Sequence, residues 1–333
     1  LRSNMQHIFP GADPSIYGIA TDPEATPVQI ASVALALTRL AEQAHGGDAG
    51  AWTTYHATVY GLHEHRDPVT LAARTYVTEQ AHRVDDHYAP LVEHDQALSP
   101  DEFREHAMAV GGPAQRSAHP MSVHLFDGPP SAPDLAIYMR HHWHRTKRFY
   151  TLFGEFGRRL PLSDVAPIYG NLFDETGCES PEATPHPTML QRLLQHMGVP
   201  CDLDDHSELT SGQAYLNNRV RCMRSRQPEW GWGMLFSLEC IVHGVHGKIL
   251  RQLRQLGLDE DMCEFHRLHS ELDADHAAEL LDIIVDRVRT AQQQRIFFSS
   301  IALHQQRGQR YFDAIWTQIQ QQHRRTVPQR AAI

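Results

Sequence analysis

Apolar residues along this chain recur at intervals of three and four positions and almost never alternate with polar ones. The segment 27–45 shows this pattern well, because Val28, Ala31 and Leu35 recur at helical spacing after the cap signal of Thr26. Strands would show a period of two, and such signals are nearly absent. The pattern therefore predicts an all-α protein.

Further helices are indicated by the same periodicity together with capping residues, prolines and terminating glycines. The expected segments are 51–62, 68–94, 100–110, 131–160, 163–176, 186–199, 207–226, 228–256, 259–293 and 296–325. Residues 1–24 are predicted to be irregular, and the stretch 113–133, rich in Gly and Pro, is predicted to be a connection. A boundary within it divides the chain into a helical extension, 1–115, and a larger domain, 116–333.

One predicted helix carries polar residues where an ordinary helix would carry its apolar face. Within 264–280, His269, Asp273 and His276 occupy positions i, i+4 and i+7, which lie within roughly 60° of one another around a helix. Unpaired polar groups on a buried face are costly unless a partner satisfies them. A metal ion would satisfy all three together, so we interpret this stripe as a metal-binding motif.

An octahedral ion needs more ligands than this stripe supplies, so other helices are expected to contribute carboxylates or histidines. Glu239 lies in an apolar stretch, 234–245, where an unpaired carboxylate would be costly. Glu155 also lies among apolar residues, so it is a candidate ligand for the same reason. Glu175 and His186 flank a loop containing Gly and Pro, which lets two consecutive helices present one ligand each at a common point.

Each candidate also has an ordinary structural explanation. The stripe within 264–280 would be a solvent-exposed polar face, and Glu239 a buried carboxylate paired with an arginine. The two residues that flank the loop would cap their helices. Glu155 would be a surface residue beside Arg158 and Arg159.

The ligand types narrow the choice of metal. Mixed histidine and carboxylate ligation, with no thiolate pattern, suits iron or manganese better than a structural zinc. Three Glu, one Asp and three His would serve two ions. Such a pair can bind and reduce dioxygen with electrons that side chains do not supply, so the site suits an oxidase better than a hydrolase.

In this order and with these gaps, the candidate residues resemble the heme-oxygenase-like diiron oxidase family. The segment 171–190, NLFDETGCESPEATPHPTML, is similar to the family's connection between its second and third core helices, and the resemblance spans about residues 132–325. It implies a heme-oxygenase-like bundle of about seven core helices, two Fe(II) ions and O2 as co-substrate. The implied iron ligands are Glu155, Glu175, His186, Glu239, His269, Asp273 and His276.

The resemblance also implies a biosynthetic function. We expect an O2-dependent dinuclear non-heme iron oxidase acting on a free amino acid or a related small molecule, with an external electron donor. The leading reaction is desaturation of an aliphatic C–H, with ring closure as a further step, and N-oxygenation of an amine or guanidine is the alternative. A heme- or ligand-binding helical protein without oxygen chemistry is the alternative of another class, but it needs one axial His and not these carboxylates.

Additional residues are candidates for supporting the ligands or the substrate. His243 and His246 follow Glu239 by four and seven positions and share its face, and His266 precedes His269 by three. For each of these histidines, an ordinary structural role is the alternative.

A basic run, 219–226, offers Arg221 and Arg224 for a substrate carboxylate, which Arg binds well through bidentate hydrogen bonds. A solvated helix face is the alternative for this run.

Composition limits the partners. The 333 residues carry a formal net charge of −10 and no basic cluster with interleaved aromatics, so no nucleic acid is expected. No apolar run approaches the roughly 20 residues of a membrane span, so no membrane partner is expected. Five widely spaced cysteines without a CxxC pair indicate a reducing, cytoplasmic setting. The extension 1–115 resembles helices with which some family members dimerise, which allows a homodimer.

Overall fold

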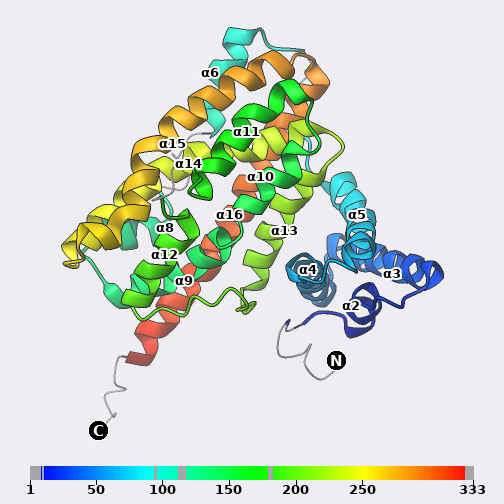
Figure 1. The fold of residues 1–333 in the computed structure, drawn as a ribbon, viewed down its shortest axis with the longest axis horizontal. Coiled ribbons are helices and arrows are strands. Elements are labelled where there is room, and N and C mark those ends of the chain that lie inside the picture. The colour runs from blue at the N-terminus through cyan, green and yellow to red at the C-terminus, as the bar shows by residue number, and fades with distance from the viewer. Residues whose placement is uncertain (1–8, 10, 94–95, 112–117, 179–182, 327–333) are drawn as a thin grey trace. The chain divides into compact units, whose positions relative to one another are not determined.

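The computed structural model describes residues 9, 11–93, 96–111, 118–178 and 183–326 (Figure 1). Within the helices, the side chains of residues 242–243, 272–276 and 326 lie outside this description. The regular elements of the described residues are all helices, and none is a strand. The prediction of an all-α protein is therefore confirmed.

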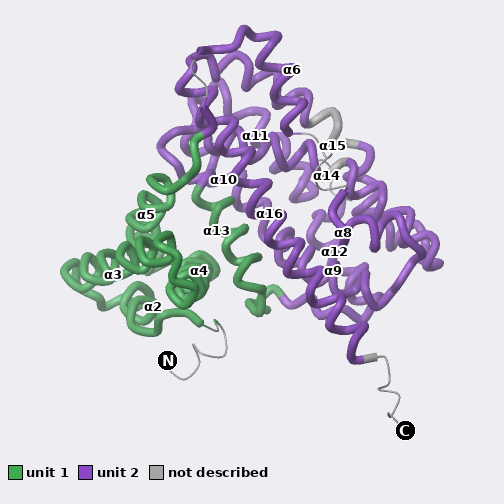
Figure 2. The backbone as a smooth tube through the Cα atoms, turned by 180° about the vertical axis from the view of Figure 1, so that it is seen from behind, with its two compact units in different colours: residues 1–91, 203–221 green, residues 92–202, 222–333 purple. Residues whose placement is uncertain are grey.

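The chain divides into two compact units, which Figure 2 distinguishes by colour. Unit 1 comprises residues 1–91 and 203–221, and unit 2 comprises residues 92–202 and 222–333. This division differs from the expected boundary between 115 and 116. Residues 92–111 fall in unit 2 rather than in the N-terminal unit, because α6 (Pro100–Gly111) packs against the three long helices α14, α15 and α16. The expected capping box at its start is present, since the Glu102 amide donates to Ser99 Oγ and the Ser99 amide donates to the Glu102 carboxylate.

Unit 1 is built on four consecutive helices and most of a fifth. They are α2 (Pro14–Ala20), α3 (Pro27–His45), α4 (Ala49–Glu64), α5 (Leu71–Tyr88) and α13 (Thr210–Arg224), which continues into unit 2 after residue 221. Helix α3 packs against α4 and α5. Their apolar faces meet in a core that contains Leu37, Ala41, Tyr55, Val59 and Val77.

Helix α2 lies within residues 1–24, where the sequence predicted irregular structure, so that prediction was wrong for this part. Asp13 caps the helix by accepting hydrogen bonds from the amides of Ser15 and Ile16. Ile16 and Tyr17 are buried in the core of unit 1. Seven residues are too short to show a helical period, so the tertiary burial that stabilises α2 left no clear sequence signal.

Unit 2 contains the longest helices of the chain. Besides α6 it comprises α8 (Pro120–Ser122), the π-helical turn η1 (Val123–Asp127), α9 (Ala132–Thr146), α10 (Tyr150–Gly157), α11 (Leu162–Glu175), α12 (His186–His196), α14 (Pro228–Gln255), α15 (Glu260–Arg287) and α16 (Ala291–Thr326). Helix α14 packs along both α15 and α16, and α12 packs on α15.

Close approach of α14 to α16 depends on a glycine. A Cβ atom at Gly233 would lie 2.4 Å from the carbonyl oxygen of Phe297, a distance that no side chain tolerates. On the same helix, Trp230 accepts a hydrogen bond of 2.6 Å at its carbonyl from Ser300 Oγ. Small residues therefore hold the central helices of unit 2 at short range.

Two helical predictions for unit 2 were wrong in detail. The expected helix 131–160 is broken into α9 and α10, because the Phe149 amide bonds back three residues to Thr146 instead of four. Neither Gly nor Pro marks this break, so periodicity alone continues across it. The expected connection 113–133 contains α8 and η1, a short element whose π-helical hydrogen bonding has no sequence period of its own.

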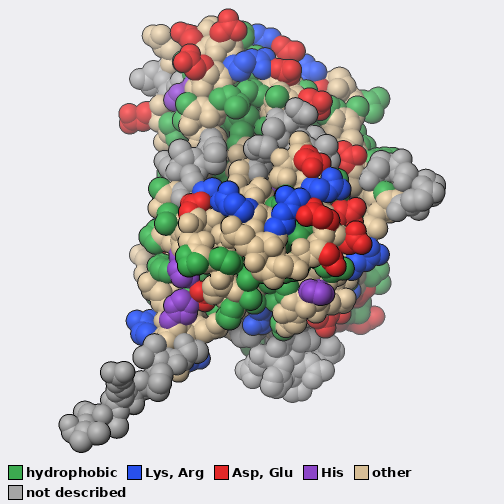
Figure 3. Space-filling model, turned by 90° about the vertical axis from the view of Figure 1, so that its left-hand side faces the viewer, with side chains coloured by type: hydrophobic (Ala, Val, Ile, Leu, Met, Phe, Trp, Pro, Cys, Tyr) green, Lys and Arg blue, Asp and Glu red, His purple; other side chains and the backbone are tan. Residues whose placement is uncertain are grey.

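Charges of both signs mix on the surface. On the face drawn in Figure 3, Lys and Arg side chains lie next to Asp and Glu side chains. Exposed pairs such as Arg254 with Glu260 contribute little stability individually. The five cysteines form no disulfide. Among the described helices, none combines the length and apolarity that crossing a membrane would require.

Candidate metal centre

Two ligands predicted from the sequence lie at the ends of two consecutive helices. Glu175 is the last residue of α11, and His186 is the first residue of α12. Between them Gly177 adopts a φ of +66°, and a Cβ atom there would lie 2.9 Å from the Pro185 nitrogen. Only glycine suits this backbone, which places the end of one helix beside the start of the next.

His269 from α15 completes a cluster with these two residues. Glu175 Oε2 lies 3.4 Å from His186 Nδ1, and Glu175 Oε1 lies 3.6 Å from His269 Nε2. The three ligand atoms all lie within 4.8 Å of one another. An ion with bonds of about 2.1 Å separates neighbouring ligand atoms by roughly 3 to 3.5 Å. The spacing therefore fits a divalent transition ion better than strong hydrogen bonds, which are about 2.7 to 2.9 Å long.

Electrostatics also favour a cation here. Burial by itself would raise the pKa of Glu175, but interaction with the neighbouring imidazoles of His186 and His269 lowers it to about 2. Glu239, in the middle of α14, is 7% exposed, and its burial together with the charge of Glu175 raises its pKa to about 8. At neutral pH the two carboxyl groups thus hold one proton between them. A metal ion would replace that proton.

A neighbouring cysteine does not add a thiolate. Burial and the charge of Glu239 raise the pKa of Cys240 to about 12. At neutral pH its thiol stays protonated, and a protonated thiol is a poor metal ligand. The donor set near Glu239 is therefore imidazole and carboxylate, which suits iron.

Comparison with known proteins decides the family. Residues 136–306, more than half of the chain, match the family of iron-containing redox enzymes. The chain belongs to this family. Residues 4–88 match the haem-oxygenase-associated N-terminal helices, so the helical extension expected from the sequence is present. No curated protein matches the chain.

Solved structures similar to this iron-containing redox enzyme share its fold. A domain of unknown function with a heme oxygenase-like fold from Shewanella denitrificans OS217 matches at 18% identity, 67% of this chain, 94% of that chain and a TM-score of 0.55. A CADD-like protein of unknown function from Nostoc punctiforme PCC 73102 matches at 13% identity, 65% of this chain, 98% of that chain and the same TM-score. The predicted heme-oxygenase-like fold with an N-terminal helical extension is confirmed.

In this iron-containing redox enzyme, buried histidines form a layer next to His269. The ring centroid of His246 lies 4.7 Å from that of His269 and 4.8 Å from that of His266. Burial lowers the pKa of His266 to about 3 and that of His246 well below its ordinary value. Both imidazoles are therefore neutral at physiological pH. Both lie close to His269, and a role in supporting the ligands stays a prediction.

One member of this layer was missed by sequence reasoning. His142 from α9 lies with its ring centroid 5.4 Å from His246 and 5.6 Å from His266. The signal that could have found it is the run His141, His142 and His144 on a predicted helix. Spacing alone does not say which of these histidines points toward the bundle interior.

Three predicted residues lie outside the described side chains. Asp273 and His276 are on the α15 backbone, four and seven residues after His269, and His243 is on the α14 backbone. Their roles stay predictions.

Glu155 and the two arginines differ from the expected arrangement. Glu155 on α10 accepts a hydrogen bond of 3.0 Å from Arg224, so its partner is an arginine distant in sequence and not Arg158 or Arg159. It is not among the three clustered ligands.

Arg221 belongs to unit 1, where it donates to Asp86 and Asn218. The structure thus gives Arg224 a carboxylate partner in unit 2 and directs Arg221 to partners in unit 1. Neither contact was visible from the basic run 219–226 alone.

Proposed function

We propose that this iron-containing redox enzyme is a dinuclear non-heme iron oxidase that uses O2 to oxidise a small molecule. The observation that supports this most is the cluster of Glu175, His186 and His269 next to a second buried carboxylate, Glu239. The charge of Glu175 raises the pKa of buried Glu239, and a proton or a cation at the site relieves this repulsion. A heme-binding protein needs only one axial histidine. The two carboxyl groups of this site instead favour metal ions, which neutralise their negative charge.

The chain's own residues would hold two ions in a buried, defined geometry. Glu175 lies between two imidazoles and would be a carboxylate ligand of the ions, while Glu239 would supply a further carboxylate. Asp273 and His276 of α15 would extend the ligand set, and Glu155 joins it in the family pattern. Iron, when bound, supplies electrons that O2 chemistry requires, and an external donor would restore them for the next turnover.

The neutral histidine layer shapes the surroundings of this centre. Because His246 and His266 are uncharged, they add no positive charge that would repel a divalent ion. Their burial also keeps bulk water away from that side of the cluster. Such an environment suits a reaction on an unactivated C–H, which bulk water would otherwise intercept.

We propose a free amino acid or a close derivative as substrate, with desaturation of an aliphatic C–H as the leading reaction and ring closure as a further step. Arg224, which already binds a carboxylate in Glu155, is the candidate for holding a substrate carboxylate. N-oxygenation of an amine or guanidine is the alternative for the same site.

A substrate screen tests this function. The protein is loaded anaerobically with Fe(II), given a reductant and exposed to O2 with each of the twenty amino acids and simple derivatives. At least one of these compounds is expected to raise oxygen consumption above the substrate-free rate. Mass spectrometry of the product distinguishes desaturation, which removes two hydrogens, from N-oxygenation, which adds oxygen. The Glu175→Ala variant is the control that should lose the response. Iron binding without any substrate-dependent oxygen consumption would contradict the proposal.

A further inference from the structure

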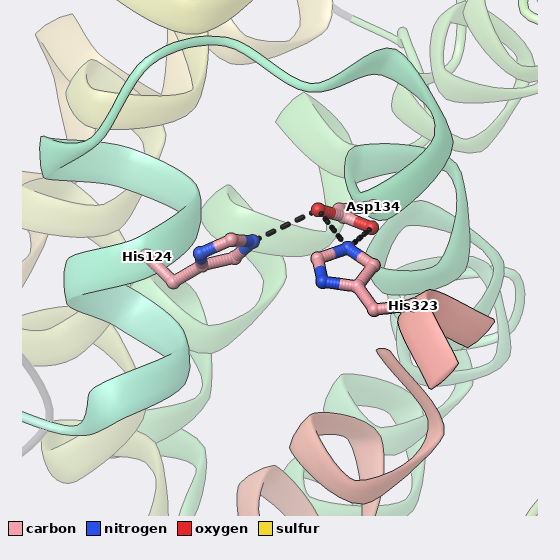
Figure 4. Close-up of side chains that lie close together, drawn as sticks. All are labelled: His124, Asp134 and His323. Carbon is pink, nitrogen blue, oxygen red and sulfur yellow. Dashed lines mark hydrogen bonds and ion pairs between the residues drawn. The ribbon is translucent and has the colours of Figure 1, made fainter. Parts of the chain in front are cut away.

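A second cluster of potential metal ligands lies elsewhere in unit 2. It brings together His124 from η1, Asp134 from the first turn of α9 and His323 from the last turns of α16 (Figure 4). His124 and Asp134 come from consecutive elements, and His323 comes from a helix far along the chain, 189 residues after Asp134. None of the three belongs to the centre described above. Sequence reasoning did not single out any of them.

Both imidazoles point the same ring nitrogen at one carboxylate. His124 Nε2 lies 2.8 Å from Asp134 Oδ2, and His323 Nε2 lies 2.8 Å and 2.9 Å from the two carboxylate oxygens. The ligand atoms all lie within 4.8 Å of one another. At these distances the two Nε2–H groups donate hydrogen bonds to the carboxylate. A divalent transition ion would replace these protons and bind the same two nitrogens and the carboxylate, with the ligand atoms moving apart to roughly 3 to 3.5 Å.

The surroundings hold these donors in place. Asp134 is 2% exposed, and its backbone amide donates to Ser131 Oγ, which caps the start of α9. The ring of Trp316 on α16 lies with its centroid 5.1 Å from that of His124. Burial alone would raise the pKa of Asp134, but hydrogen bonds from His124 and His323 lower it below its ordinary value. The carboxylate is therefore in the form that binds metal.

The two histidines remain open to solvent. The side chain of His124 is 34% exposed, and that of His323 is 49% exposed. An ion can therefore enter from solvent, and water can fill a coordination position that the three residues leave open. Sites with three protein ligands and one water are characteristic of Zn²⁺.

We propose that His124, Asp134 and His323 bind a divalent transition-metal ion, for which Zn²⁺ is the best fit. Zn²⁺ suits this set because nitrogen and oxygen donors bind it more tightly than they bind Mn²⁺ or Fe²⁺. The ion would link the end of α16 to η1 and to the start of α9. By joining these three segments the ion would fix the end of α16 to the rest of unit 2, independently of the oxidase function proposed above.

Zinc uptake by the full-length, metal-stripped chain tests the site. Competition against a chromophoric chelator measures stoichiometry and affinity for the wild type, His323→Gln and His124→Gln. Glutamine keeps a hydrogen-bond donor for Asp134 but is a poor zinc ligand, so it separates metal binding from hydrogen bonding. Each variant is expected to bind one Zn²⁺ fewer than the wild type, or to bind it at least about 100-fold more weakly.

A matched control is available on the same unit. His196, at the end of α12, is exposed and belongs to neither ligand cluster, so His196→Gln should retain the full zinc stoichiometry. Circular dichroism checks that all variants are folded. Because His323 is the more exposed of the two histidines, its replacement should perturb the fold less than replacement of His124. Equal zinc uptake by the wild type and both cluster variants would overturn the proposal, as would an equal loss in His196→Gln.

Zn²⁺ should also raise Tm through this site. At a concentration well above Kd, the wild type is expected to gain at least about 3 °C more than His323→Gln. Both proteins keep the cluster of Glu175, His186 and His269 intact. Any rise in Tm caused by zinc at that cluster is therefore the same in both and does not affect the difference. An identical gain in the two proteins would contradict a structural link at the end of α16.

Discussion

His269 donates its Nδ1–H to the carbonyl oxygen of Phe265, one turn earlier in α15, across 2.7 Å. A carbonyl can only accept, so this contact fixes the tautomer and leaves the lone pair on Nε2. That nitrogen faces Glu175. A histidine oriented in this way by a backbone acceptor is ready to bind a metal.

Replacement of His269 should therefore remove metal. His269→Ala is expected to lose most of its iron at the cluster and to reduce any O2-dependent activity at least about 100-fold, since one of the clustered ligands is gone. Iron is measured with a chromophoric chelator after anaerobic loading and desalting. His196→Ala, an exposed histidine on α12, serves as the control and should load fully. Full iron retention in His269→Ala would remove this residue from the ligand set.

Metal uptake should release a proton from Glu239. Its pKa of about 8 leaves it mostly protonated at pH 7, and a carboxyl group must lose its proton to bind a cation. At saturating metal, the wild type should therefore release about one proton more than Glu239→Gln. Well above this pKa the difference should disappear, because Glu239 is then already ionised.

Calorimetry in two buffers of different ionisation enthalpy measures the proton release. Glu175→Gln serves as a comparison, because removal of the neighbouring charge should lower the pKa of Glu239 and reduce the release at neutral pH. Equal release by the wild type and Glu239→Gln would show that Glu239 does not exchange its proton for metal.

Replacement of Gly177, between α11 and α12, tests whether the backbone there determines the spacing of Glu175 and His186. Gly177→Ala should lower stability by about 2 kcal/mol or more and weaken iron binding, because the new Cβ combines a left-handed φ with a contact of 2.9 Å to Pro185. Glu175 and His186 would then be pushed apart. Chemical denaturation and iron titration measure the two effects.

Gly198→Ala is the matched control for this turn. Gly198 has a φ of +68°, but no atom lies within 4 Å of the position that a Cβ would take, so the variant should lose only about 1 kcal/mol and bind iron normally. Equal iron affinity in both variants would mean that the turn does not determine the ligand spacing.

Unit 1 should show its own pH dependence through Asp85. Burial by itself would raise the pKa of this carboxyl, but hydrogen bonds from His45 and Tyr55 and the nearby His82 and His56 lower it. A lowered folded pKa stabilises the protein above the ordinary aspartate pKa of about 4, and this contribution declines as the pH falls below that value.

Asp85→Asn should therefore lower the free energy of unfolding by about 3 kcal/mol at pH 7. It should also reduce the loss of stability between about pH 5 and about pH 3, a range that includes the ordinary aspartate pKa of about 4. Urea denaturation at a series of pH values measures this. Asp22→Asn, at an exposed position of the same unit, should leave the acid dependence unchanged. An unchanged acid dependence in Asp85→Asn would mean that this residue does not contribute to it.

Local features were predictable because they depend on residues close in sequence. The helical period, the capping box at Ser99 and the polar stripe that begins at His269 each involve positions within a few turns of one another. The loop between Glu175 and His186 was recognisable because its glycine and prolines restrict the backbone locally. The fold followed from the same signals combined with the family resemblance.

Contacts between distant segments were decided only by the tertiary structure. The sequence was enough to predict that the chain is helical, and it also predicts a metal-binding stripe on α15. Only packing paired Glu155 with Arg224, placed His142 in the histidine layer, and joined His124 and His323 on Asp134. Helical periodicity specifies which side of a helix is buried, but not which residue of another helix it meets. That choice depends on how helices from distant parts of the chain pack together.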